Sequence, residues 1–229
     1  MHLQPHSPEA EAVRKIRTGV MLVRAELPSR AVLITSVAPQ EGKTVVVANL
    51  AIALAQAGRK VLLVDADMRK PRLGTLFPGE NDGPGLVQLL STDLGLDAAI
   101  RPTDIEHLSF LPCVATAEQP SELLESPRLL TVISAAKARY DFVLFDSPPL
   151  LAVTDAVVLA SRVDGVVLVV KGGSTPRELL HRGLAMLTEA QAAPAGGVLN
   201  LVAMRGRHAR NHAYPYQYYH RYYGRGEDA

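Results

Sequence analysis

A turn near the start of the chain has the residue types of a phosphate-binding loop. The letters SVAPQEGKT fill positions 36–44. An apolar stretch typical of a buried strand precedes them at 31–36, and apolar residues at helical spacing follow over 44–56. Backbone N–H groups at such a turn face an anion, while Lys43 reaches the β- and γ-phosphates and Thr44 binds Mg²⁺. The pattern predicts that nucleotide is bound by Gln40, Glu41, Gly42, Lys43, Thr44 and Val45.

The match to the strict phosphate-loop pattern is incomplete. That pattern has glycine where this chain has Val37, so a glycine-containing turn before an ordinary helix is the alternative interpretation. The predicted strand before the turn and the predicted helix after it favour phosphate binding.

Three carboxylates follow the ends of predicted strands. Asp65 ends the apolar stretch VLLVD, Asp67 lies two residues later, and Asp146 ends the stretch FVLFD. Open α/β sheets bind ligands at the carboxyl ends of their strands, where carboxylates can organise Mg²⁺ or accept a proton from a hydroxyl. For Asp65 and Asp67 the alternative is a solvated turn or a helix cap. The predicted catalytic residues are Lys43, Asp65, Asp67 and Asp146, and the predicted metal ligands are Thr44, Asp65 and Asp146.

Six apolar stretches alternate with amphipathic ones, which is the pattern of a parallel sheet covered by helices on both faces. The expected strands are 31–36, 61–65, 108–111, 142–146, 166–170 and 198–202. Helix starts are marked by Ser7-Pro8, by Ser126-Pro127 and by a capping box at 175–178. The fold class is therefore a doubly wound, mostly parallel α/β domain over residues 1–204, including an N-terminal helix within 1–26, and a flexible tail over 205–229.

Composition narrows the class of protein further. The chain has 229 residues, a formal charge of +1 and one cysteine, so a disulfide framework is excluded and a bulk polyanion is not an expected partner. No apolar run approaches the roughly 18 residues of a membrane-spanning helix. We therefore expect a cytoplasmic protein that does not bind nucleic acid.

The aromatic residues are unevenly distributed. Of the 11 Phe and Tyr residues, five lie in 1–213 and six in 214–223. The segment 205–229 has five Arg against Glu227 and Asp228, a formal charge of +3. Stacking on nucleic acid and packing against the domain are alternative uses of this segment. The hypothesis that we favour is that its tyrosines accept phosphoryl groups: Tyr214, Tyr216, Tyr218, Tyr219, Tyr222 and Tyr223.

The order and spacing of these motifs resemble a known family. SVAPQEGKT, VLLVDADMRKPRL and FVLFDSPP are similar to the Walker A, A′ and B motifs of bacterial tyrosine kinases (BY-kinases), which belong to the MinD/ParA-like P-loop ATPases. Segments PSELLESPRL and GGVLN and the terminal tyrosines extend the resemblance over nearly the whole chain. It departs at Gln40, where these kinases usually have glycine. MinD/ParA proteins carry a signature lysine where this chain has Ala38, which favours the kinase.

The resemblance implies a function and partners. It implies an ATP- and Mg²⁺-dependent tyrosine autokinase that acts on the tail of another copy and regulates capsule or exopolysaccharide synthesis and export. It also implies a separate transmembrane activator that recruits the protein to the inner face of the membrane, and a cognate tyrosine phosphatase. Asn200 would contact adenine. The alternatives are a non-kinase regulatory ATPase of the MinD/ParA type and a catalytically silent nucleotide-binding scaffold.

A charge pattern in the N-terminal helix bears on assembly. Glu11, Arg14 and Arg17 are spaced three residues apart, so they lie on neighbouring surface of a helix. They resemble the family's E-x-x-R-x-x-R motif, which joins subunits into rings. The alternative is a solvated helix with internal Glu–Arg pairs worth a few tenths of a kcal/mol each, roughly.

Overall fold

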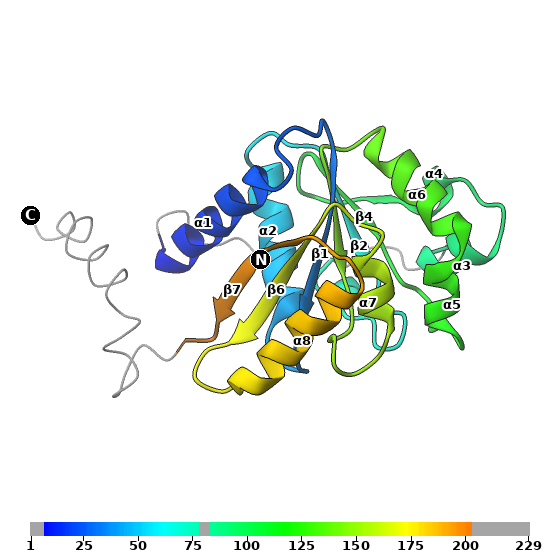
Figure 1. Cartoon of the computed structure of the whole chain (residues 1–229). Coiled ribbons are helices and arrows are strands. Elements are labelled where there is room, and N and C mark those ends of the chain that lie inside the picture. The colour runs from blue at the N-terminus through cyan, green and yellow to red at the C-terminus, as the bar shows by residue number, and fades with distance from the viewer. Residues whose placement is uncertain (1–6, 78–82, 203–229) are drawn as a thin grey trace, which may run out of the picture.

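The computed structural model describes residues 7–77 and 83–202. In this part of the chain seven strands form one sheet in the order β3-β4-β2-β5-β1-β6-β7 (Figure 1). All neighbouring pairs are parallel except β3 and β4. The strands are β1 (Arg30–Ser36), β2 (Val61–Asp65), β3 (Arg101–Pro102), β4 (Leu108–Leu111), β5 (Phe142–Asp146), β6 (Gly165–Lys171) and β7 (Pro194–Asn200).

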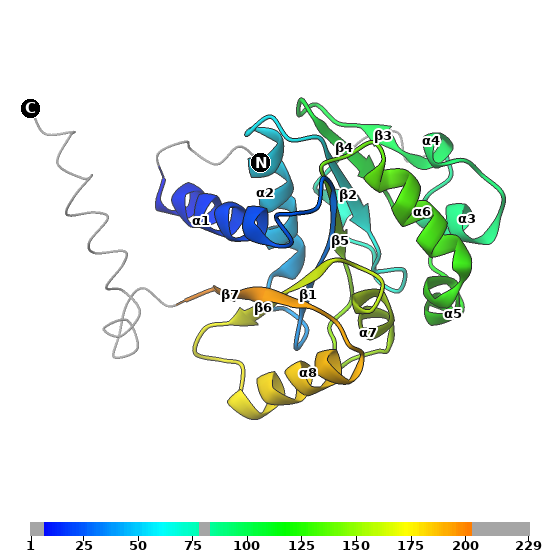
Figure 2. The same ribbon diagram turned by 45° about the horizontal axis from the view of Figure 1, so that its top comes forward.

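Helices cover both faces of the sheet. Helices α1 and α2 lie on one face, and helices α6, α7 and α8 lie on the other (Figures 1 and 2). The bounds are α1 (Pro8–Leu22), α2 (Lys43–Ala55), η1 (Leu73–Thr75), α3 (Leu86–Ser91), α4 (Leu96–Ala99), α5 (Pro120–Glu125), α6 (Pro127–Lys137), α7 (Asp155–Ala160) and α8 (Arg177–Glu189).

The central strands form because both of their faces are buried. β2 and β5 are buried at every position, and β1 at every position except Arg30. Their side chains are aliphatic with few aromatics, which suits close packing of helices on both sides. The predicted doubly wound, mostly parallel α/β fold is confirmed.

Several predicted boundaries differ from the structure. The N-terminal helix ends at Leu22, because Val23 is already extended and Arg24 has a φ of 44°. The last strand begins at Pro194, four residues before the predicted start, because edge pairing with β6 does not require an apolar side-chain run. β3 was not predicted, since its two residues carry no periodic signal.

Two predicted helix caps also differ. Pro8 and Pro127 are early helical residues, as expected, and Ser7 accepts a hydrogen bond from the Ala10 N–H. Ser126 occupies the predicted N-cap position of α6, but its hydroxyl makes no capping bond and donates to the Leu123 carbonyl. The capping box at the start of α8 was wrong: α8 has no side-chain cap, because Thr175 is used elsewhere.

Candidate active site

The phosphate-loop turn joins β1 to α2 at the carboxyl edge of the sheet. Gly42, with a φ of 85°, precedes the first residue of α2, and no side chain caps the N–H groups there. A Cβ atom at Gly42 would collide with the Asn200 amide nitrogen, and a φ of this sign is strained for any other residue. The geometry therefore leaves the N-terminus of a 13-residue helix open toward an anion, as the sequence predicted.

Gln40 occupies a left-handed backbone conformation in this turn. Its φ is 63°, a region that glycine adopts freely and other residues adopt at a cost of roughly 1–2 kcal/mol. Gln40 therefore adopts a conformation that the glycine usual in the family would adopt without this cost. The backbone strain falls on Gln40, which is exposed.

The three predicted carboxylates meet beside this turn. Asp65 and Asp146 are directly opposite one another in the register of β2 and β5, and each is 1% exposed. Asp67 is 7% exposed, and its Oδ2 lies 3.8 Å from the Lys43 Nζ. The sheet topology thus brings residues from three separate motifs to one edge.

The carboxylates differ in what already holds them. Asp65 accepts hydrogen bonds from the Arg72 and Leu73 N–H groups, at 3.1 and 3.0 Å, and a longer one from Asp67 at 3.3 Å. Asp65 therefore fixes the loop after β2. This resembles the helix-cap role that was the alternative interpretation of Asp65 from the sequence. Asp67 accepts a hydrogen bond from the Lys70 N–H through Oδ1, and its Oδ2 faces Lys43.

Burial raises the pKa of two of these groups. Burial, with the neighbouring Asp146 charge, raises the pKa of Asp65 to about 7, although backbone N–H groups partly oppose this. Burial raises the pKa of Asp146 to about 6, against the attraction of Lys43. Both carboxyls hold their protons more tightly in the folded protein than in the unfolded chain.

These residues fit a magnesium–nucleotide complex. Both oxygens of Asp146 are buried and lack a hydrogen-bond partner in the described residues, which is costly unless a cation or donor arrives. No group of three or more His, Cys, Asp or Glu residues suited to a metal occurs in residues 7–77 and 83–202. Mg²⁺ would therefore depend on Thr44, Asp146, phosphate oxygens and water, which is how Mg²⁺ is usually held in nucleotide sites.

The raised pKa values predict a pH dependence of stability without ligand. Because the folded state binds more protons than the unfolded state, the stabilisation is present below about pH 4 and is lost as pH rises through about 6 and 7. We expect the free energy of unfolding to fall by about 4 kcal/mol between pH 5 and pH 8, at about 1.4 kcal/mol per pKa unit, because the folded pKa lies about two units above pH 5 for Asp65 and about one unit above it for Asp146. Urea unfolding at intervals of one pH unit measures this.

The control for that measurement is Asp65→Asn, which should flatten the profile. Addition of Mg²⁺ and ADP should stabilise the protein more at pH 8 than at pH 5, since the ionised carboxylates then have a cation beside them. A ligand-free stability that rises from pH 5 to pH 7 would contradict the assignment.

An ion pair between the exposed Arg69 and the buried Asp155, which the sequence did not reveal, stabilises the A′ segment. Arg69 donates to both oxygens of Asp155, at 2.8 and 2.9 Å, and the Ser121 hydroxyl donates to Asp155 at 2.7 Å. Burial alone would raise the pKa of Asp155, but the hydrogen bonds from Arg69 and Ser121 outweigh it and lower the pKa. Arg69 follows Asp67 by two residues, so this pair fixes the loop that carries Asp67.

The residues predicted for assembly contact their own chain. The Arg14 Nε lies 2.7 Å from a Glu11 carboxylate oxygen, and the Arg17 guanidinium donates to the Ala53 carbonyl of α2 at 3.3 Å. The intrahelical pair is the alternative that the sequence offered. A role of these three residues between subunits stays a prediction.

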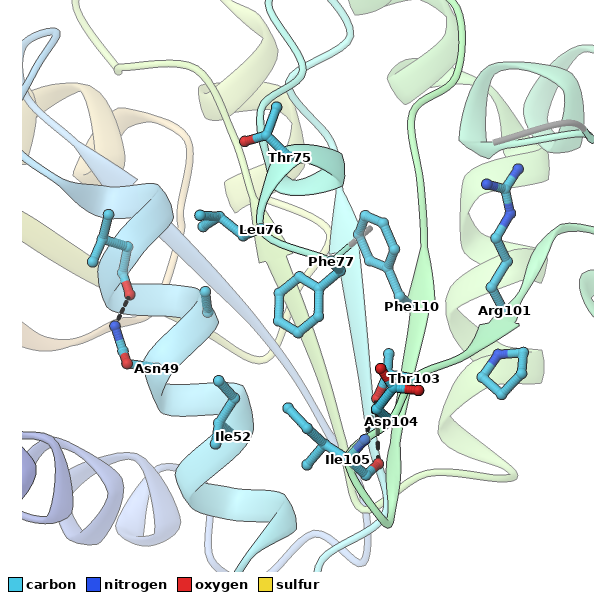
Figure 3. Close-up of a pocket in the computed structure, with 13 residues that line it drawn as sticks. Asn49, Ile52, Thr75, Leu76, Phe77, Arg101, Thr103, Asp104, Ile105 and Phe110 are labelled. Carbon is cyan, nitrogen blue, oxygen red and sulfur yellow. Dashed lines mark hydrogen bonds between the residues drawn. The ribbon is translucent and has the colours of Figure 1, made fainter. Parts of the chain in front are cut away.

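A cavity lies beside the site on the other flank of α2. It has a volume of about 570 Å³ and lies between α2, η1 and the β3–β4 edge (Figure 3). The rings of Phe77 and Phe110, 5.5 Å apart, face into it. Its walls include Val45 but none of the residues Lys43, Asp67 and Asp146, so it is separate from the carboxylate cluster.

Comparison with known proteins identifies the family. A family model described as an AAA domain matches residues 34–190. The tyrosine-protein kinase YwqD of Bacillus subtilis is 38% identical over 197 residues, which is 86% of this chain and 83% of YwqD. The chain belongs to the BY-kinase family. A second member, the putative tyrosine-protein kinase CapB of Staphylococcus aureus, is 34% identical over 95% of this chain and 93% of CapB.

Solved structures agree with this membership. The kinase domain of the Escherichia coli tyrosine kinase ETK superposes with a TM-score of 0.83 at 32% identity, over 88% of this chain and 79% of that one. The septum site-determining protein MinD from Pyrococcus horikoshii, solved with Mg-ADP, gives a TM-score of 0.64 at 30% identity over 75% and 70%. The BY-kinase fold is thus shared with MinD, as the resemblance implied.

Two sets of predictions remain outside what the structure tests. The six phosphoacceptor tyrosines, Tyr214 to Tyr223, and the predicted boundary between the domain and the tail at residues 204 and 205 fall outside the described residues.

Within residues 7–77 and 83–202, no helix combines the length and apolarity needed to cross a bilayer.

Proposed function

We propose that this BY-kinase is an ATP-dependent protein-tyrosine autokinase that phosphorylates its C-terminal tyrosines in another copy of itself. The observation that carries the proposal is the similarity to tyrosine-protein kinases over 86% of the chain, together with Lys43 and three carboxylates at one sheet edge. The acceptors are Tyr214, Tyr216, Tyr218, Tyr219, Tyr222 and Tyr223. The process that it regulates is capsular or exopolysaccharide synthesis and export.

Each site residue has a proposed role. ATP and Mg²⁺ supply the transferable γ-phosphoryl group and its charge neutralisation. Lys43 and the N–H groups from Gln40 to Val45 hold the phosphates, while Thr44 and Asp146 hold Mg²⁺. Asp67 accepts the proton of the tyrosine hydroxyl as the tyrosine oxygen bonds to phosphorus and ADP leaves, since its backbone bond from Lys70 uses Oδ1 and its Oδ2 faces Lys43 at the loop. Asp65 assists the metal site and positions the loop that carries Asp67.

The experiment that tests the function is phosphotyrosine mapping. The protein is incubated with Mg-ATP and the cytoplasmic segment of its proposed transmembrane activator, and mass spectrometry locates the phosphate. We expect phosphate on tyrosines between 214 and 223, and none in a variant with all six changed to phenylalanine. ATP hydrolysis without phosphotyrosine would instead support a MinD-type regulatory ATPase, and binding without either reaction would support a silent scaffold.

Assembly and location are part of the same proposal. The protein forms a ring through Glu11, Arg14 and Arg17, is recruited to the inner face of the membrane by the activator, and is reset by a tyrosine phosphatase. Replacing Glu11, Arg14 and Arg17 together with alanine is expected to reduce the mass measured by light scattering to that of a monomer. An unchanged mass would remove these residues from the interface.

A further inference from the structure

A charged side chain in the phosphate loop ties the loop to residues that follow the neighbouring strand β6. Glu41 is 2% exposed. Its carboxylate accepts hydrogen bonds from the Ala38 N–H at 2.8 Å, the Thr175 hydroxyl, and more weakly the Lys171 N–H at 3.4 Å. A buried carboxylate is costly unless it is bonded in this way, so the position of Glu41 depends on these donors.

The backbone of the same residue is held by a second strand end. The Asn200 amide donates to the Glu41 carbonyl at 2.9 Å and fills the space where a side chain at Gly42 would lie. Asn200 is paired with Lys171 at the ends of β7 and β6, and its own carbonyl accepts the Gly172 N–H at 2.7 Å. Two adjacent strand ends therefore hold one residue of the loop.

The use of Thr175 has a local cost. Its sequence context, Thr-Pro-Arg-Glu, is that of a capping box, yet α8 has no side-chain cap. A threonine cap is worth about 1 kcal/mol. The Thr175 hydroxyl instead accepts the Lys171 N–H at 3.2 Å and donates to Glu41. Because Thr175 bonds to Glu41 and does not cap α8, its position is set by the phosphate loop and not by the helix that follows it.

We propose that Glu41, Thr175 and Asn200 form a clamp that holds the phosphate loop in its phosphate-binding conformation before the nucleotide arrives. Thr175 and Asn200 are positioning residues in this view, and the clamp rests on the proposed use of a nucleotide at this loop. Asn200 then acts on the phosphates through Glu41 and Gly42, not through an adenine contact. A preformed loop binds more tightly because less ordering remains for the binding step.

Binding measurements with two ligands test the clamp. The affinities of Mg-ADP and of magnesium pyrophosphate, which lacks adenine, are measured by calorimetry. Thr175→Val removes the hydroxyl while keeping the shape, and should weaken both ligands about tenfold, or about 1.4 kcal/mol. Thr175→Ser should restore affinity to within about threefold, which a loss of packing alone would not allow. The matched control is Thr188→Val in α8, whose hydroxyl donates within its own helix, to the Leu184 carbonyl.

Asn200→Ala separates the clamp from the adenine hypothesis. A clamp predicts that both ligands weaken by the same factor, whereas an adenine contact predicts that only Mg-ADP weakens. Affinities within about twofold of wild type in Thr175→Val, or a selective loss of Mg-ADP in Asn200→Ala, would overturn the proposal.

The outcome is distinguishable from failure of the kinase proposal. Both ligands bind without phosphoryl transfer, so a wild-type protein that binds them but forms no phosphotyrosine would refute the kinase while the clamp is still decided by the variants. If Thr175→Val does not fold, the Asn200→Ala comparison decides the clamp.

Discussion

Replacing Lys43 with methionine is expected to lower phosphotyrosine formation by at least a hundredfold while the fold is kept. Lys43 is the first residue of α2, and its ammonium group lies 3.8 Å from Asp67 beside the open helix N-terminus. A single preorganised charge aimed at a reacting group is worth about 10²–10³ in rate. Methionine keeps most of the stem, so packing at the start of α2 should change little. The measurement is a time course of phosphotyrosine with Mg-ATP and the activator segment.

A matched lysine provides the control for this variant. Lys60 is an exposed residue just before β2, and Lys60→Met should leave the time course within about twofold of wild type. Circular dichroism and the melting temperature of both variants report whether the fold is kept. Residual phosphorylation above a tenth of wild type in Lys43→Met would show that Lys43 is not the principal phosphate ligand.

Replacing Arg69 with methionine is expected to cost about 3 kcal/mol of stability. Asp155 is fully buried, so the loss of its two bonds from Arg69 leaves a buried charge without its cation. Among the described residues, the Ser121 hydroxyl then remains as a side-chain donor to Asp155. For a chain of this size the melting temperature should fall by roughly 6–12 °C. Thermal unfolding followed by circular dichroism measures the change.

The double variant Arg69→Met/Asp155→Asn identifies the cause of this loss. It removes the orphaned charge, and should recover more than half of the stability lost in Arg69→Met. Asp155→Asn alone should cost less than Arg69→Met, because a neutral amide is cheaper to bury than an unpaired carboxylate. A double variant as unstable as Arg69→Met would show that the loss comes from packing of the arginine stem.

The local signals in the sequence were reliable where structure is set by burial and short-range geometry. The stretches that became β1, β2, β4 and β5 are continuous and apolar, so their type and approximate bounds followed from composition alone. Gly42, Lys43 and Thr44 were also placed correctly, since a glycine turn between a strand and a helix has few backbone solutions. The edge strands β3 and β7 were missed or displaced, because pairing and not side-chain periodicity defines them.

Long-range contacts explain the remaining differences. Thr175 has the sequence of a helix cap, and only its proximity to Glu41, 134 residues earlier, gives its hydroxyl a better partner. Asp155 likewise resembles an ordinary residue in the first turn of a helix until Arg69 and Ser121 are brought to it. In both cases a side chain bonds to a partner that is distant in the sequence and not to one nearby. A single sequence carries no signal of the distant partner.

The fold class, the phosphate loop and the three carboxylates were predictable from residue types and their spacing, because buried strands and a turn that binds phosphate each require particular residues at fixed positions. The tertiary structure decided how those residues work together. The register of β2 and β5 sets Asp65 beside Asp146, whose charge adds to burial in raising the pKa of Asp65, and groups at the ends of β6 and β7 bond to Glu41. Electrostatic coupling and loop positioning depend on distances across the sheet, and those distances exist only once the chain has folded.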